Sequence, residues 1–394
     1  MSTTTRPRAG FTLIELMLSL GLFSLLLVGL LQLLDTSTTL WKQVDSRRDE
    51  TEVSGALSDR LARDLSTLEA GPEGDLLVDW GVVDVDKNGV AGLRVARLRF
   101  VRRASPAEVA RLRFQLTPPE DPTAPVPVSD DGEPLPADWS RVDRGLVEVA
   151  WVLASAERPL TAGAAPTFEG VLLRGERFLD DPDRLSFFDP RFLPVTSLSG
   201  RPTEGLTEEL LRGVLWMEPA LATQTTLTDT NLGPEDASFQ WKVGDRISDG
   251  ASSWDAWNLE RPDLGLSSLN EPGVGMPDLD PARPGATPLL PRRVRVSFEI
   301  QRPKDLRTVL RAPIDHDETS FSVADGERLP PEGGHFLVDE EWMQLLSKSG
   351  DRVTVQRGQR GTLGTPHKAS APIQFGWRTL REVPIGLSRE EWNL

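Results

Sequence analysis

One carboxylate interrupts the longest apolar segment of the chain, and its position suggests a specific chemistry. Residues 11–34 read FTLIELMLSLGLFSLLLVGLLQLL, with Glu15 as the single charged residue. A carboxylate inside a membrane span costs about 2.5–3.5 kcal/mol on insertion scales, so it needs a partner or access to water. If the chain were cut between Gly10 and Phe11, the new α-amine would lie one helical turn from Glu15. In an assembly, Glu15 would then pair with the amine of a neighbouring subunit; the alternative is that Glu15 lies near the membrane interface and reaches water.

A second group of oxygen ligands lies further along the chain. Asp84, Asp86 and Asn88 match the first half of a calcium loop, D-x-D-x-N-G. The bidentate carboxylate expected at the twelfth position is replaced by Val95, so Asp79 or a more distant acid would have to substitute. The alternative is a hairpin whose Asn-Gly turn carries solvated aspartates. Calcium is the one cofactor candidate, and no cofactor is otherwise expected.

Other catalytic and binding chemistry finds little support in the residues. The chain has no Cys, and its three His residues (His316, His335 and His367) match no zinc spacing. No G-x-S-x-G elbow and no glycine-rich phosphate loop is present. A net charge of −16 argues against a nucleic-acid partner, because phosphate contacts need a basic surface. We therefore expect a protein that is not an enzyme.

The apolar segment is long enough to cross a bilayer as a helix. No small-x-small cleavage site follows it, as it would follow the core of a conventional secretory signal. Arg6 and Arg8 precede it, and basic residues close to a first span favour a cytoplasmic N-terminus. These features predict a single-pass membrane protein whose large C-terminal part lies outside the cytoplasm.

The sequence GFTLIE after a short basic leader resembles the type III signal of the type IV pilin superfamily, which includes the pseudopilins of type II secretion. The resemblance implies that prepilin peptidase cuts after Gly10, that Phe11 is then N-methylated, and that Glu15 is needed for subunit docking. Thr12 matches the polar second position often seen in pseudopilins. Ala9 departs from the Lys or Arg that many members carry directly before the glycine.

Weaker similarity extends beyond the signal. Three stretches resemble the J-type minor pseudopilin, namely Leu61–Leu65 (LARDL), Trp254–Trp257 (WDAW) and Leu290–Ile300. They are also similar to PilW-type minor pilins, which sequence does not separate cleanly. The resemblance implies a structural subunit at or near the tip of a pseudopilus, in the bacterial inner membrane with a periplasmic C-terminal domain. Implied partners are prepilin peptidase, other major and minor pseudopilins, and secreted cargo or the secretin. The alternative is a minor type IV pilus subunit with a binding or adhesion role.

The elements after the membrane segment predict an α+β fold. Apolar residues three and four positions apart, among them Leu57, Leu61 and Leu65, predict that the helix continues amphipathically until Gly71-Pro72. An antiparallel sheet should cover its apolar stripe, because strand-like alternation follows at 75–83, 93–101, 109–116, 145–154, 168–177, 214–218 and 292–301, with a short helical stretch at 207–211.

The extra length of the chain has a predicted location. Short strands punctuated by glycine turns mark a small β module at 308–375, and the strand-like segments on both sides of it should pair as one hairpin with the module at its tip. The expected organisation is a leader at 1–10, a transmembrane helix at 11–34, its amphipathic continuation at 35–70, a pseudopilin-like domain at 71–307, the inserted module at 308–375, and a returning strand at 376–394.

Overall fold

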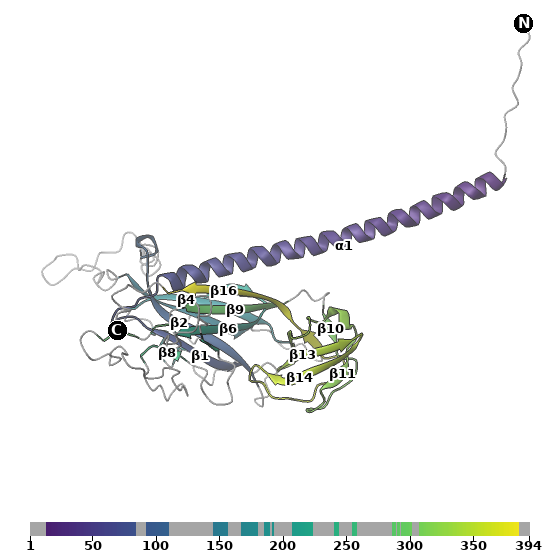
Figure 1. Ribbon diagram of the computed structural model, residues 1–394. Coiled ribbons are helices and arrows are strands. Elements are labelled where there is room, and N and C mark those ends of the chain that lie inside the picture. Colours follow the sequence, from purple (N-terminus) through teal and green to yellow (C-terminus); the bar gives the residue numbers. More distant parts are fainter. Residues whose placement is uncertain are drawn as a thin grey trace, which may run out of the picture. The chain divides into compact units, whose positions relative to one another are not determined.

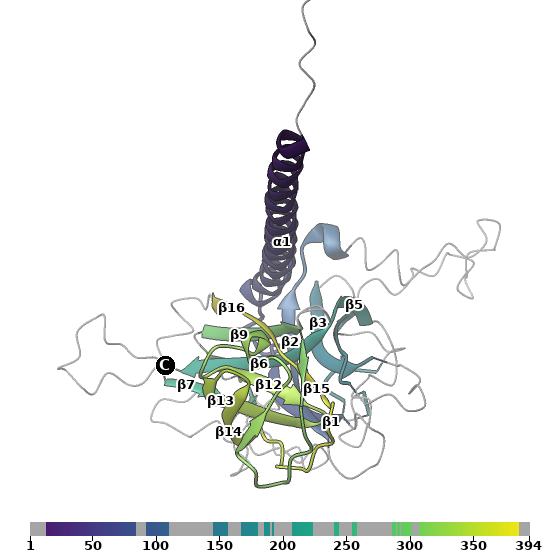
Figure 2. The ribbon, with the colours of Figure 1, turned by 90° about the vertical axis from the view of Figure 1, so that its right-hand side faces the viewer.

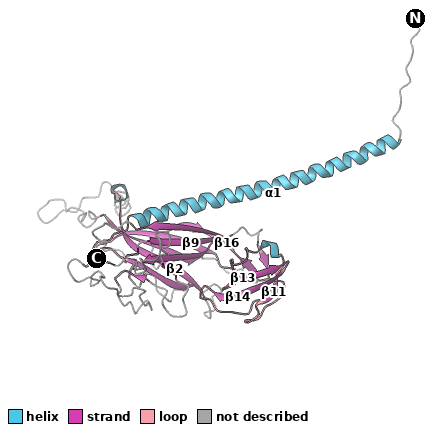
Figure 3. Cartoon of the chain, viewed as in Figure 1, coloured by secondary structure: helices cyan, strands magenta, loops and turns pink. Residues whose placement is uncertain are grey.

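The computed structural model describes part of the chain. The described residues are 13–83, 92–109, 145–156, 167–179, 185–189, 191–192, 207–223, 240–243, 254–257, 286–288, 290–291, 293–301 and 307–385. The chain divides into two compact units, 1–57 and 58–394. The described part contains one long helix and is otherwise mostly strand (Figure 3).

Helix α1, Leu13–Ser66, has 54 residues and a length of about 81 Å at the usual rise per residue (Figure 1). Its stretch Leu16–Leu34 has a mean hydropathy of 2.3, and none of it is buried within the chain. Leucine side chains are exposed all around this stretch. A helix this apolar on every side requires a non-aqueous surrounding, which a bilayer or neighbouring apolar helices provide.

The first sheet has six antiparallel strands in the order β5-β4-β3-β2-β1-β8. Their bounds are β1 Leu76–Val83, β2 Leu93–Arg103, β3 Leu146–Ser155, β4 Gly170–Phe178, β5 Thr207–Arg212 and β8 Trp254–Asp255. Strands β2, β3 and β4 are buried along almost their whole length, so both faces of the sheet are covered. Trp254 and Trp257 are buried beside β1.

The second sheet has four antiparallel strands in the order β16-β9-β6-β7 (Figure 2). Their bounds are β6 Val214–Thr223, β7 Gln240–Val243, β9 Arg293–Gln301 and β16 Gly376–Pro384. The chain passes from β5 into β6 through Gly213, whose φ of +81° is in the region that glycine tolerates best. The two sheets pack through tryptophans: the rings of Trp80 and Trp216 lie 5.3 Å apart.

The C-terminal turns of α1 belong to the same compact unit as the sheets. Leu61 and Leu65 are fully buried there, and Glu69 and Leu68 join the chain to β2 by backbone pairing. The spacing of leucines in the sequence predicted this apolar stripe, and its burial confirms it.

Residues 308–374 form a third, six-stranded sheet between β9 and β16, in the order β10-β15-β12-β13-β14-β11. Its elements are β10 Thr308–Val309, β11 Ser320–Ser322, the 3₁₀ turn η5 Gly326–Arg328, β12 His335–Val338, β13 Glu341–Ser349, β14 Arg352–Gln359 and β15 Pro372–Gln374. It has its own apolar core around Phe336, Met343 and Val355. Strands β9 and β16 pair from Gln301 with Gly376 to Arg293 with Pro384, as predicted for the two flanks.

Two local predictions need correction or lie outside the described chain. The helical stretch predicted at 207–211 is wrong, because these residues form strand β5 at the edge of β4. Glu and Leu favour a helix locally, but pairing with β4 outweighs that propensity. In the strand predicted at 109–116, residue 109 lies in a short helical turn, and 110–116 are outside the described residues.

Candidate functional site

The predicted processing site lies at the edge of the described chain. Gly10, Phe11 and Thr12 fall outside the described residues, and α1 begins at Leu13. The backbone of Glu15 lies in the first turn of α1, and its side chain is not described. The structure therefore places the predicted docking residue on the apolar helix.

The predicted calcium ligands Asp84, Asp86 and Asn88 also fall outside the described residues. They belong to the connection between β1 and β2, which pair up to Val83 and Leu93. Asp79, considered as a substitute ligand, is unsuited to that role. Its carboxylate is completely buried and accepts from Arg97, with a second ion pair to Arg99.

A buried carboxylate near the end of α1 holds the helix to the first sheet. Asp64 is 1% exposed, and both of its oxygens accept from Arg174 on β4, at 2.7 and 2.8 Å. The indole nitrogen of Trp151 on β3 donates to the same carboxylate at 3.0 Å. Bidentate arginine pairing fixes orientation as well as distance. These bonds therefore set the rotation and height of the last helical turns on the sheet.

A second acid completes this network. Arg102 on β2 donates to Glu176 at 2.8 Å and lies 3.4 Å from Asp64. Glu176 also accepts from Arg174. Burial alone would raise the pKa of Glu176, but hydrogen bonds and positive charge from the two arginines lower it to about 2. Glu176 is thus ionised at neutral pH. The stretch LARDL, which contains Asp64, carried only a resemblance in the sequence, and no local pattern predicted this role for Asp64.

The module contains a second buried charged cluster around His367. The ring lies between two carboxylates, with Nδ1 2.7 Å from Asp339 and Nε2 2.9 Å from Glu341. Burial by itself lowers the pKa of His367, but hydrogen bonds to these carboxylates outweigh burial and raise it. Arg357 forms two hydrogen bonds to Glu341, at 2.6 and 2.7 Å. The cluster links β12, β13 and β14 to the segment that leads into β15.

The three histidines do not form a shared site. His316 is exposed, and His335 lines a pocket together with residues of the second sheet. In the part of the chain that the structure describes, no three acidic or histidine side chains are arranged to hold a metal ion. The contacts of His367 are those of a structural clamp.

Comparison with known proteins gives one match, to the N-terminal segment. Residues 5–31 match the family model described as the prokaryotic N-terminal methylation motif. No curated protein and no solved structure matches the chain. The matched segment includes the predicted cleavage and docking positions and most of the apolar stretch of α1. This motif indicates a type IV pilin-like protein, a pilin or a pseudopilin, which is anchored in a membrane, processed by prepilin peptidase and assembled with other pilin-like subunits.

Proposed function

We propose that this protein is a minor pseudopilin, a structural subunit at or near the tip of a type II secretion pseudopilus. The observation that carries the proposal is the methylation motif leading directly into a 54-residue helix. The sequence similarity of Leu61–Leu65, Trp254–Trp257 and Leu290–Ile300 to J-type pseudopilins supports the finer assignment. In this role the protein is not an enzyme.

The proposed membrane arrangement follows from the N-terminal residues. The leader lies in the cytoplasm, α1 crosses the inner membrane, and the sheets lie in the periplasm. Cleavage after Gly10 releases a chain that begins with N-methyl-Phe11, and Glu15 neutralises the amine of a neighbouring subunit. Two sheets and an inserted module make a bulky subunit, which fits more easily at a filament end, where neighbours are missing on one side.

A second candidate is a minor subunit of a type IV pilus whose module binds a partner or surface. The observation that favours it is the module itself, a sheet with its own core carried between β9 and β16. Such an insertion adds an independent surface without disturbing the pairing of the strands that carry it. In the pseudopilus, the same surface would contact cargo or the secretin.

Deletion of the gene in its own host distinguishes the two functions. The secretion role predicts that type II substrates accumulate in the periplasm while surface pili persist. The pilus role predicts loss of pili or of adhesion while secretion continues. A strain that carries the chain with Gly10 replaced serves as the matched control, because its protein has the same sheets and cannot be processed. A deletion that leaves both secretion and piliation unchanged would contradict both candidates.

A further inference from the structure

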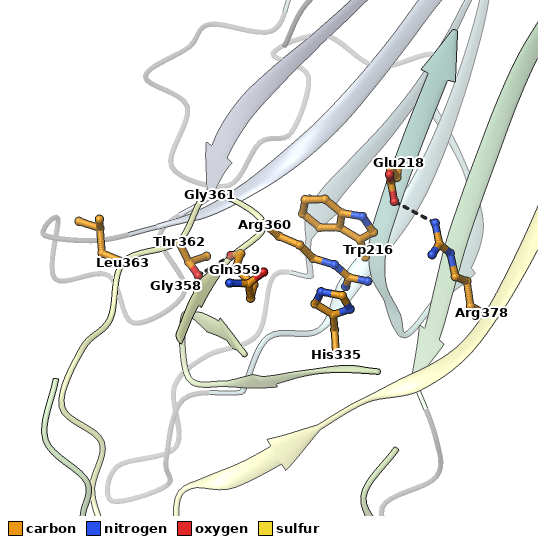
Figure 4. A pocket seen from close by; sticks show the side chains of 10 residues that line it. All are labelled: Trp216, Glu218, His335, Gly358, Gln359, Arg360, Gly361, Thr362, Leu363 and Arg378. Carbon is orange, nitrogen blue, oxygen red and sulfur yellow. Dashed lines mark hydrogen bonds and ion pairs between the residues drawn. The ribbon is translucent and has the colours of Figure 1, made fainter. Parts of the chain in front are cut away.

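A pocket of about 530 Å³ lies where the module meets the second sheet (Figure 4). Its volume falls within the range of small-ligand sites. Three elements supply its polar walls: β6 with Trp216 and Glu218, β16 with Arg378, and β12 with His335. The loop after β14, residues 360–363, closes one side.

Arg360 gives this pocket a fixed wall. Its φ of +52° is unusual for a residue other than glycine, so the surrounding contacts must hold it in place. Its guanidinium lies 4.8 Å from the ring of Trp216 and 4.1 Å from that of Trp342, and it pairs with Glu299 at 2.8 Å. Cation–π contact and ion pairing together fasten the loop to the second sheet. The wall is thus preformed.

The pocket presents hydrogen-bond donors that the described chain does not use. Arg378 is 53% exposed, and its Nη2 donates to Glu218 at 3.1 Å and to Ser297 at 3.0 Å. Its Nε and Nη1 have no acceptor among the described residues. The indole nitrogen of Trp216 lacks an acceptor in the described ranges, but it is buried, so a ligand would reach it only if the ring moved. A ligand that satisfies these donors must bring acceptor atoms.

The charged groups of the pocket place two guanidinium groups beside His335. Burial, together with the positive charges of Arg360 and Arg378, lowers the pKa of His335 to about 4. The ring is therefore neutral at pH 7. Each arginine also pairs with a carboxylate, Arg378 with Glu218 and Arg360 with Glu299, so an acidic ligand would share Arg378 with Glu218. Leu363, 78% exposed on the rim, adds an apolar contact for the rest of a ligand.

We propose that this pocket binds a carboxylate carried by an organic ligand, with Arg378 as the main contact and Trp216 and His335 beside it. Two sources share this chemistry: a free small carboxylate, and an acidic side chain of a peptide segment from another protein. The proposal holds for a pilus subunit as well as for a pseudopilus subunit, so its failure leaves the proposed function unaffected.

The three histidines allow a direct test with the full chain in detergent micelles. Histidine-labelled protein gives three ring signals, and His335→Asn identifies the one from the pocket. The probes are succinate, the capped dipeptide acetyl-Leu-Glu-amide, and acetyl-Leu-Gln-amide as the uncharged control. We expect a saturable shift of the His335 signal with a carboxylate probe, and binding weaker by about tenfold or more for the glutamine peptide. Preference for the glutamate peptide over succinate would identify a peptide ligand, and the reverse a small molecule.

Matched arginine variants separate this site from general charge effects. Arg378→Gln should weaken binding by about tenfold or more. Arg311→Gln is the control, because Arg311 is similarly exposed at 56% and pairs with Asp351 at 2.7 Å. An unchanged His367 signal shows that the module remains folded in each variant. No saturable shift with either carboxylate, equal binding of the glutamine peptide, or equal effects of the two variants would overturn the proposal.

Discussion

Asp64 joins the end of α1 to three strands, and its replacement tests how the helix is held. Asp64→Asn removes the charge that Arg174 and Arg102 face in a buried site. Breaking a buried ion pair typically costs about 3–5 kcal/mol. Because Glu176 still pairs with both arginines, we expect a loss near the lower end of this range in the free energy of unfolding, measured with denaturant on the full chain in micelles.

Asp59→Asn on the same helix is the control for that experiment. Asp59 is 72% exposed and lies 3.9 Å from Arg381, so its removal should change the unfolding free energy by less than about 1 kcal/mol. Equal effects of the two variants would contradict the anchoring role of Asp64.

His367 predicts a pH dependence of the stability of the module. Its pKa is raised in the folded chain, so its stabilising contribution is complete below the unfolded pKa of about 6.5. The contribution is lost as pH rises through the folded pKa. We therefore compare amide hydrogen exchange in residues 335–349 after correction for the intrinsic rise of exchange rates with pH. Above the folded pKa of His367, exchange should accelerate more in the wild type than in His367→Gln. His316→Gln, at an exposed position, is the control and should show the same pH dependence of exchange as the wild type. If the wild type and His367→Gln showed the same pH dependence, the structural role of His367 would be contradicted.

The buried charges show where sequence reasoning stops at the residue scale. Arginines in the alternating segment of β2 resemble the solvent-facing side of an amphipathic strand. Instead Arg97, Arg99 and Arg102 are buried, because acids from other elements pair with them. Asp64 and Arg174 are 110 positions apart in the chain, and no local pattern joins them. No local pattern predicted the pocket either, because Arg360, Arg378 and His335 come from separate parts of the chain. The glycines on both sides of Arg360 were the one local sign of an unusual backbone there.

At the scale of elements, the density and alternation of apolar residues predicted β1, β2, β3, β4, β6 and β9, although the first four strands are buried along nearly their whole length and not on one face alone. This pattern failed at β5, where an edge strand has helix-forming residues and gains its structure from β4. The paired flanks of the module were also predictable, since both alternate and the segment between them has its own turns.

This arrangement predicts that the module can be removed. Replacing residues 302–375 by Asn-Gly joins Gln301 to Gly376 through a two-residue turn suited to a hairpin. We expect the two main sheets to persist, with lower thermal stability. Glu299 loses Arg360, and Phe168 loses its two backbone hydrogen bonds with the side chain of Gln374. Adding Glu299→Gln should recover part of that loss, because the glutamine leaves no unpaired buried charge.

Circular dichroism measures whether the two main sheets persist in the shortened chain, and thermal unfolding compares its stability with that of the full chain. Retained sheet signal with a lower, still cooperative transition supports an inserted module. Loss of cooperative unfolding in both shortened variants would show that the main sheets depend on the module to fold.

At the scale of the whole molecule, the N-terminal segment was the most predictable part. Its length, apolarity and leader depend on local sequence, and both the family match and α1 agree with them. Whether the filament is a secretion pseudopilus or a type IV pilus was not predictable in this way, because that difference depends on surfaces that contact other proteins. The processing residues and the calcium segment remain predictions, since they lie outside the described chain.

Glu15 provides a prediction about assembly. Glu15→Gln keeps the size of the side chain and removes the charge that the proposed amine pairing requires. We expect the variant to be cleaved normally and inserted in the membrane, but to be lost from isolated filaments or from crosslinked complexes with other subunits. Glu52→Gln, an exposed position of α1, is the control and should assemble normally. Normal incorporation of Glu15→Gln would contradict the docking role.

The most direct test of the central claim is the intact mass and N-terminal sequence of the protein extracted from membranes of its own host. The pilin-like account predicts a chain that starts at N-methyl-Phe11, and an uncut precursor when Gly10 is replaced. A mature chain that still starts at Met1 would contradict it, and would leave a membrane-anchored protein whose Glu15 needs another explanation.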